Sequence, residues 1–247
     1  MRLLAGIDPI APRLRLLLAA AMLIALSAST MAWADDLGIS GHQIRLVNAG
    51  FEIEFSGGMG QGSADELSRM LDANPAVRVV HLNSPGGLVG EGRRMMDIIQ
   101  RHLLITTTDN FCLSACTLAF LGGRERYLAP GAHLGFHSEY SDKISEAQVE
   151  DSQRRDEVTM ISLGIPGDFV DKAFATPKDR IWIPKVSELE DAHVITGVSS
   201  DYVLQAKAPS SDTTGSKAGA AVKPVGSDTP AVEETPAGVT IYRGPGW

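Results

Sequence analysis

The sequence predicts an α/β protein with a mainly parallel sheet, and the order of its segments is the main reason. Short β-branched stretches, such as residues 77–82 and 103–108, alternate with segments of helical apolar spacing across glycine-rich turns. Strand, loop and helix in repetition form right-handed βαβ units. The chain of 247 residues is 44% hydrophobic and 21% charged, which suffices for one well-buried domain.

Local signals support each element of this domain. Ser63 with Glu66, and Ser145 with Gln148, have the spacing of capping boxes, so each pair is expected to open a helix. The second of these helices is polar, runs to about residue 163, and is expected to project from the core or to meet a partner subunit. The expected strands are residues 42–49, 51–55, 77–82, 103–108, 132–137 and 180–183, and residues 194–204 close the domain.

The two ends of the chain differ from this domain of residues 35–205. Residues 1–34 have a basic start, an apolar run from Leu16 to Leu26 and an Ala-x-Ala site at residues 32–34, which together predict a cleaved signal peptide. A membrane tether follows only if that signal stays uncleaved. Residues 206–247 are rich in Ala, Pro, Ser, Thr and Gly, which predicts a disordered tail. We therefore expect a periplasmic or secreted protein.

Charge and cysteine content exclude several classes of function. The first 34 residues carry three arginines and one aspartate, so their removal changes the net charge from −8 to −10. Such an acidic chain is a poor ligand for nucleic acid or an anionic membrane. The chain has two cysteines, which exclude a disulfide scaffold and a four-cysteine zinc site. The sequence implies no metal or organic cofactor.

The residue pattern around Ser114 predicts acyl transfer by serine. Ser114 lies among small residues at the expected start of a buried helix, where it can serve as nucleophile, and Ala115 follows it. Upstream, the turn Asn83-Ser84-Pro85-Gly86-Gly87 can present bare backbone N–H groups. The N–H groups of Gly87 and Ala115 are the expected oxyanion donors. The alternatives are a plain N-cap serine and an ordinary strand-to-helix turn.

The base and the acid that orients it each have more than one candidate among the residues. His137 ends an alternating strand and is the expected base, but His133 lies on the same face of that strand. Asp179 is the expected residue that orients the base. Its alternative is a residue that ends a turn after Pro177, and Asp171 is the other acidic candidate.

Cys112 and Cys116 bracket Ser114 with a spacing of four residues. In an oxidising compartment they can form a local disulfide that pins the nucleophile loop, since helical spacing of four is near the upper part of the permitted Cα separation. The alternatives are two small buried residues and Cys116 itself as nucleophile.

The Ser-Pro-Gly-Gly turn, the segment from Ser114 to the glycine pair at residues 122–123, and the strand that ends in His137 resemble the proteolytic subunit of the Clp protease. The resemblance runs from about residue 51 to residue 203 and is closest to periplasmic Clp-like proteins that share the Cys-x-Ser-Ala-Cys pattern. It implies a crotonase-like, Clp-protease-like superhelix of repeated βαβ units. It also implies a serine peptidase with protein or peptide substrates, and a possible homo-oligomer. Asp179 is implied by the Asp-Arg pair before an apolar strand.

The resemblance leaves three competing functions open. A Ser-Lys peptidase similar to signal peptide peptidase would need a lysine aimed at Ser114, and Lys143, Lys172 and Lys178 are the candidates. A non-catalytic binding or scaffold protein could keep the same fold. An acyl-CoA enzyme of the crotonase group is disfavoured by export, because CoA thioesters are cytosolic. Processive degradation driven by an ATPase is not expected outside the cytoplasm.

Overall fold

The computed structural model describes residues 41–198, 232–234 and 240–242. The predicted signal peptide and most of the predicted tail lie outside these residues. The strands are β1 (His42–Val47), β2 (Glu52–Gly57), β3 (Val79–Asn83), β4 (Ile105–Thr108), β5 (Phe111–Leu113), β6 (Glu125–Leu128), β7 (His133–Gly135), β8 (Ile181–Ile183), β9 (Gly197–Val198), β10 (Val232–Glu234) and β11 (Thr240–Tyr242). The helices are η1 (Asn48–Gly50), α2 (Ser63–Ala73), α3 (Val89–Arg101), α4 (Ala115–Leu121), α5 (Glu146–Ser162), α6 (Gly167–Ala175) and α7 (Val186–Asp191).

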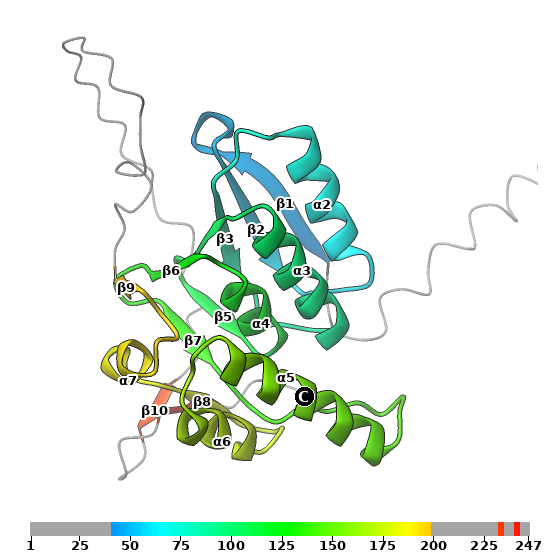
Figure 1. Cartoon of the computed structure of the whole chain (residues 1–247), viewed down its shortest axis with the longest axis vertical. Helices are drawn as coiled ribbons and strands as arrows, with labels where there is room; N and C mark the ends of the chain where they lie inside the picture. Colours follow the sequence, from blue (N-terminus) through cyan, green and yellow to red (C-terminus); the bar gives the residue numbers. More distant parts are fainter. Residues whose placement is uncertain (1–40, 199–231, 235–239, 243–247) are drawn as a thin grey trace, which may run out of the picture. The chain divides into compact units, whose positions relative to one another are not determined.

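The largest sheet has six strands in the order β1-β2-β3-β4-β6-β9 (Figure 1). Only the β1–β2 pair is antiparallel, and the pairs from β2 onward are parallel. A mixed α/β fold with a mainly parallel sheet, as the sequence predicts, is therefore confirmed. Two further sheets follow: β5 pairs with β7, and β8 pairs with β11, which pairs with β10.

Helices α2, α3 and α4 pack side by side on one face of the large sheet (Figure 1). That face is apolar because alternate residues of each strand point toward the helices: Ile53 and Phe55 of β2, with Val80 and Leu82 of β3, are fully buried. The residues between them, such as His81, lie on the opposite, polar face. The burial pattern thus fixes which face of each strand packs against the helices.

The capping box predicted at Ser63 and Glu66 is wrong. The residue before the helix is Gly62, in a left-handed conformation, and Ser63 is the first helical residue. The N-terminus of α2 is served instead by Glu91 of α3, whose Oε2 accepts from Ala64 N at 2.8 Å and from Ser63 Oγ at 3.4 Å. A buried carboxylate from a neighbouring helix thus accepts from one N–H of the first turn and lies at the positive end of the helix dipole, in place of a local side-chain cap.

The capping box predicted at Ser145 and Gln148 is confirmed, and α5 begins directly after Ser145. One side of α5 is buried at Ser152, Asp156 and Met160, so the helix is anchored to the domain.

The sequence predicts disorder for the tail, whereas β11 pairs antiparallel with β8. The open edge of β8 offers unpaired backbone groups, which explains why a tail segment can pair there.

Candidate active site

Ser114 lies at a sharp strand-to-helix turn between β5 and α4. Its backbone has φ 54° and ψ −128°, a left-handed conformation that is unusual for a residue with a side chain. Three hydrogen bonds hold it: Ser114 N donates to Gly135 O at 2.9 Å, and Ser114 O accepts from Thr117 N at 2.9 Å and from Thr117 Oγ1 at 2.7 Å. A half-buried serine on a strained strand–turn–helix is the geometry of a nucleophile elbow.

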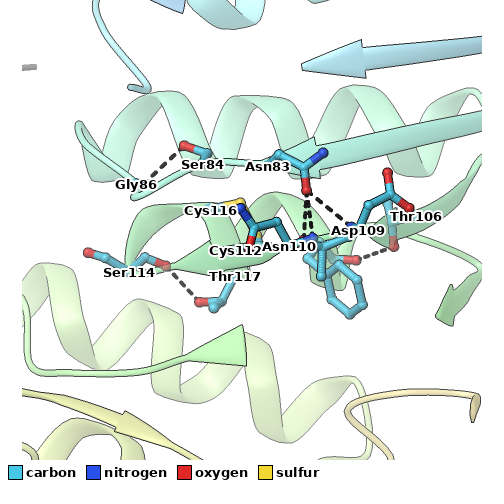
Figure 2. The surroundings of a disulfide bond; sticks show 12 residues. Asn83, Ser84, Gly86, Thr106, Asp109, Asn110, Cys112, Ser114, Cys116 and Thr117 are labelled. Carbon is cyan, nitrogen blue, oxygen red and sulfur yellow. Dashed lines mark hydrogen bonds between the residues drawn. A yellow bond between two sulfur atoms is a disulfide. The ribbon is translucent and has the colours of Figure 1, made fainter. Parts of the chain in front are cut away.

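A disulfide bond between Cys112 and Cys116 spans this turn (Figure 2). Cys112 lies in β5 and Cys116 in the first turn of α4, with a Cα–Cα separation of 5.2 Å, and both side chains are fully buried. The bond therefore ties together the two elements that meet at Ser114.

The glycine turn after β3 packs directly against Ser114. Backbone bonds between Ser84 and β5 hold it there, with Ser84 N to Phe111 O and Leu113 N to Ser84 O both 3.0 Å long. At Gly86, with φ 98°, a Cβ atom would lie 2.8 Å from Ser114 Cβ and 3.0 Å from Ala115 N. Only glycine permits this approach, because a side chain would occupy the space beside the nucleophile.

The N–H groups of Gly87 and Ala115, which the sequence predicts as oxyanion donors, belong to the two backbone segments that meet at Ser114. Met59 N donates to Gly86 O at 2.7 Å and Leu88 N donates to Met59 O at 2.9 Å, so Gly87 N points away from the Met59 segment. Ala115 N is at the start of α4, at the positive end of the helix dipole. Within residues 41–198 neither group donates a hydrogen bond to the protein. Both are thus available to a developing negative charge.

The pairing of β5 with β7 brings the segment that leads to His137 against Ser114. Leu113 is in register with Gly135, and Ser114 N bonds to Gly135 O, so His137 is two residues beyond that contact. Its Nδ1 lies 2.7 Å from Ser138 O. A carbonyl oxygen can only accept, so Nδ1 carries the proton and Nε2 keeps its lone pair. Burial lowers the pKa of His137, against the hydrogen bond to Ser138, which raises it. The ring is thus kept in the neutral form that a general base needs.

The competing histidine is the first residue of β7, which ends at Gly135, so the strand is shorter than predicted and His137 follows it. His133 is exposed and is in register with Phe111, whereas His137 is at the Ser114 end. The structure therefore separates the two candidates by their distance along the strand from the elbow.

Asp179 lies in the turn before β8, closed by a bond from Arg180 N to Pro177 O at 2.9 Å. This turn adjoins the histidine loop, because Ser138 N donates to Thr176 O at 2.8 Å. The Asp179 side chain is exposed, and in the described part of the chain its carboxylate makes no hydrogen bond or ion pair. Its role as the orienting acid stays a prediction.

The lysines expected for a Ser-Lys enzyme are placed elsewhere. Lys172 pairs with Glu188 at 2.9 Å and lies over the Trp182 ring at 4.2 Å. Lys178 lies 3.5 Å from the centre of the Tyr140 ring, and Lys143 is exposed. Asp171, the other acidic candidate, is an exposed residue of α6.

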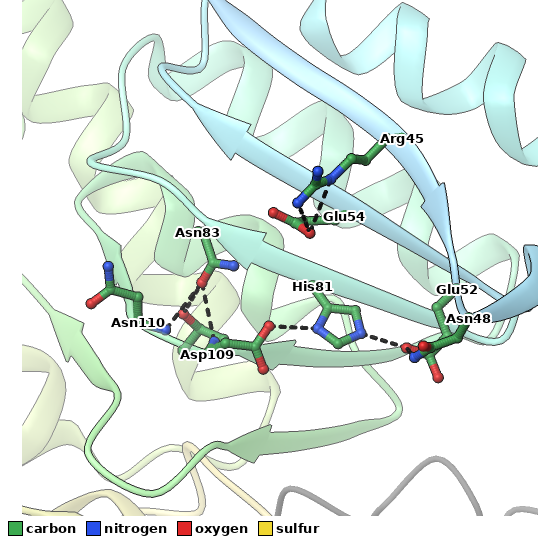
Figure 3. A network of polar contacts seen from close by, with 9 residues as sticks. Arg45, Asn48, Glu52, Glu54, His81, Asn83, Asp109 and Asn110 are labelled. Carbon is green, nitrogen blue, oxygen red and sulfur yellow. Dashed lines mark hydrogen bonds and ion pairs between the residues drawn. The ribbon is translucent and has the colours of Figure 1, made fainter. Parts of the chain in front are cut away.

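A polar network on the face of the sheet opposite α2, α3 and α4 supports the loop that leads into β5 (Figure 3). Asn83 Oδ1 accepts from Asp109 N and Asn110 N, both at 3.1 Å. His81 lies between two carboxylates, Nδ1 at 2.7 Å from Asp109 and Nε2 at 2.6 Å from buried Glu52. Although burial lowers the pKa of His81, its hydrogen bonds and charge interactions with Asp109 and Glu52 raise it overall. Sequence reasoning missed this network, although the polar residues that alternate along β2 and β3 were its signal.

Comparison with solved structures identifies the fold. The chain is similar to ClpP1 from Listeria monocytogenes, with a TM-score of 0.54 and 17% sequence identity over 61% of this chain and 92% of that one. It is equally similar to a point mutant of ClpP1 from the same organism, with a TM-score of 0.54 and 16% identity over 62% and 94% of the two chains. The chain thus has a Clp-protease-like α/β fold. No protein-family model and no curated protein matches the sequence.

Two further observations concern the described residues alone. None of their helices is both long and apolar enough to cross a membrane. Among them, no group of three His, Cys, Asp or Glu side chains is arranged to hold a metal ion.

Proposed function

We propose that the protein is an exported serine hydrolase, and specifically a peptidase. The observation that carries the proposal is the strained backbone of Ser114, held against Gly86 and followed by the N–H of Ala115. Natural proteins keep such strain where it serves a site, because it costs about 1–3 kcal/mol. The Clp-protease-like fold supports a peptidase among the serine hydrolases.

In the proposed mechanism Ser114 Oγ attacks the substrate carbonyl carbon while His137 Nε2 takes its proton. The tetrahedral intermediate places its oxyanion near the N–H groups of Gly87 and Ala115. His137 then gives the proton to the leaving amine, and the acyl-enzyme is hydrolysed by water through the same base. We propose that Asp179 stabilises the positive charge that His137 acquires in these steps.

The wider setting is proposed on separate grounds. Export is supported by the N-terminal sequence and by the disulfide, because such bonds persist in oxidising compartments. A homo-oligomer is supported by Val158 and Ile161 of α5, whose exposed fractions are 62% and 54%. We also infer a crotonase-type superhelix, from the repeated strand–helix order of the large sheet.

The test is labelling by a fluorophosphonate, read as intact mass. We expect a single adduct on the mature protein that is lost in Ser114→Ala and in His137→Ala. His133→Ala is the matched control, since it removes the other histidine of the β7 segment, and it should label like the wild type. A folded, oxidised wild-type protein without an adduct would contradict the hydrolase proposal and favour a binding protein on this fold.

A further inference from the structure

The peptide group between Ser138 and Glu139 connects His137 to helix α5. Its carbonyl oxygen, Ser138 O, accepts from His137 Nδ1 at 2.7 Å. Its N–H, on Glu139, donates to Gln153 Oε1 at 3.2 Å. Because a trans peptide is planar and its C=O and N–H point in opposite directions, fixing the N–H also aims the carbonyl at the imidazole.

Gln153 is itself held in one orientation. Its Nε2 donates to Glu157 Oε1, one turn along α5, at 3.0 Å. An exchange of the amide oxygen and nitrogen would set the NH₂ group against the Glu139 N–H and the oxygen against a carboxylate, so both contacts would become repulsive. The carboxylate of Glu157 also polarises the Gln153 amide, and this strengthens the hydrogen bond that Gln153 Oε1 accepts from the Glu139 N–H.

Arg93 of α3 anchors both sides of this connection. Its Nε donates to Asp156 Oδ1 at 2.5 Å, and its Nη2 donates to Ser152 Oγ at 2.8 Å, both on the buried side of α5. The same Nη2 donates to Glu139 Oε1 at 3.0 Å. The helix that carries Gln153 and the loop that carries His137 are therefore fixed to one guanidinium group.

We propose that Gln153 is a positioning residue that holds His137 as the Nδ1–H tautomer through the Ser138–Glu139 peptide. The hydrogen bonds run from the Glu157 carboxylate through the Gln153 amide and this peptide to the ring. The proposal rests on the proposed function, in which His137 Nε2 is the base. In this proposal Gln153 of α5 orients the His137 ring, and Asp179 acts only through the charge of its carboxylate.

The expected chemistry follows from the tautomer. Only the Nδ1–H form presents a lone pair at Nε2. If the ring exchanges between tautomers, only the Nδ1–H fraction can accept the proton of Ser114 at Nε2. In the Ser-His-Asp template a wrong tautomer lowers the turnover rate by about 10⁴. When Nε2 takes the proton of Ser114, the imidazolium donates from Nδ1 to a carbonyl already polarised by Glu157.

The test uses three variants of α5 in the full mature chain. Gln153→Leu removes both hydrogen bonds at similar volume and with good helix propensity. The exchange Gln153→Glu/Glu157→Gln keeps an acceptor oxygen for the Glu139 N–H and lets the new amide at position 157 donate to the second oxygen at position 153. Arg155→Ala changes an exposed residue of the same helix and is the control. If Gln153→Leu fails to fold, Gln153→Ala takes its place, since Gln153 is only half-buried.

The primary measurement is ¹⁵N-edited NMR of the imidazole nitrogens, with the His137 signals assigned by their loss in His137→Gln. We expect the Nδ1–H tautomer in the wild type, in Gln153→Glu/Glu157→Gln and in Arg155→Ala, and a mixture of tautomers in Gln153→Leu. The second measurement is the rate of fluorophosphonate labelling. We expect it to fall by at least about tenfold in Gln153→Leu and to change less than about threefold in the other two.

The two proposals fail in distinguishable ways. Absence of labelling in the wild type would contradict the hydrolase function, and the tautomer measurement would still decide the role of Gln153. An unchanged Nδ1–H tautomer in folded Gln153→Leu would overturn the positioning role, whatever the labelling rate, because the glutamine would then be structural only.

Discussion

Loss of the Cys112–Cys116 bond should weaken both the stability of the domain and the reactivity of Ser114. The bond closes a loop with a sequence separation of four residues. The entropy of closing so short a loop in the unfolded chain corresponds to about 2 kcal/mol. For a domain of this size, about 2 kcal/mol lowers the melting temperature by roughly 4–8 °C.

The effect on Ser114 has a separate origin. Its left-handed backbone costs about 1–3 kcal/mol, and the disulfide is one of the restraints that maintain it. If the elbow relaxes by that amount, the reactive conformation becomes about 5- to 150-fold less populated. We therefore expect reduction to slow fluorophosphonate labelling within that range.

The assay compares the wild type, with and without a dithiol reductant, to Cys112→Ala/Cys116→Ala under the same two conditions. Calorimetry gives the melting temperature, and alkylation followed by intact mass shows how many thiols are free. The variant also loses packing, about 1 kcal/mol for each buried gap, so only the reductant-dependent difference isolates the crosslink. The reasoning would be refuted by a fully reduced wild type that melts and labels as the oxidised protein does.

Four substitutions or conditions test the rest of the site. Ser114→Gly should lose labelling yet gain about 1 kcal/mol in unfolding free energy, because glycine accepts a positive φ; a loss of stability in denaturant titration would argue against strain. Gly86→Ala should cost about 1–3 kcal/mol and slow labelling, whereas Gly60→Ala, where an added methyl meets nothing, should change neither. Because burial lowers the pKa of His137, the labelling rate should rise with pH to a midpoint below 6.5, and stability should fall as the pH drops from 6.5 through that midpoint; a midpoint above 6.5 would contradict this. Burial raises the pKa of Glu139 to about 7, so wild-type stability should fall as the pH rises from 4.5 through 7, and Glu139→Gln should flatten that loss in melts across the range.

The part of the fold that local signals determine could be predicted from the sequence. The glycine turn after β3 and the small residues around Ser114 are each a short run of consecutive residues, and each carries its own backbone requirement. The same holds for the capping box at Ser145 and Gln148, which needs only four consecutive residues. Such local patterns predict the structure correctly because no residue from elsewhere in the chain takes their hydrogen-bond donors.

Where a distant group competes, sequence reasoning fails. The box at Ser63 has the right spacing, but buried Glu91 arrives from another helix and accepts from Ser63 Oγ and Ala64 N, so the Ser63 hydroxyl is engaged there and does not cap the helix. Gln153 gives no signal at all, because it acts on a backbone N–H, and any residue at position 139 except proline would supply one. Asp179 has a motif behind it, yet the exposure of its carboxylate could not be read from that motif.

The two halves of the site are held by different means, and this difference has a chemical reason. The half that carries Ser114 is overdetermined: a disulfide, the packing of Gly86 and hydrogen bonds to Gly135 and Thr117 all maintain one strained backbone. An attacking oxygen must keep its place relative to fixed N–H donors, so rigidity serves it. His137 has to exchange a proton twice in each proposed cycle. A neutral carbonyl holds its ring without fixing a charge beside it, and so leaves the neutral imidazole favoured before attack.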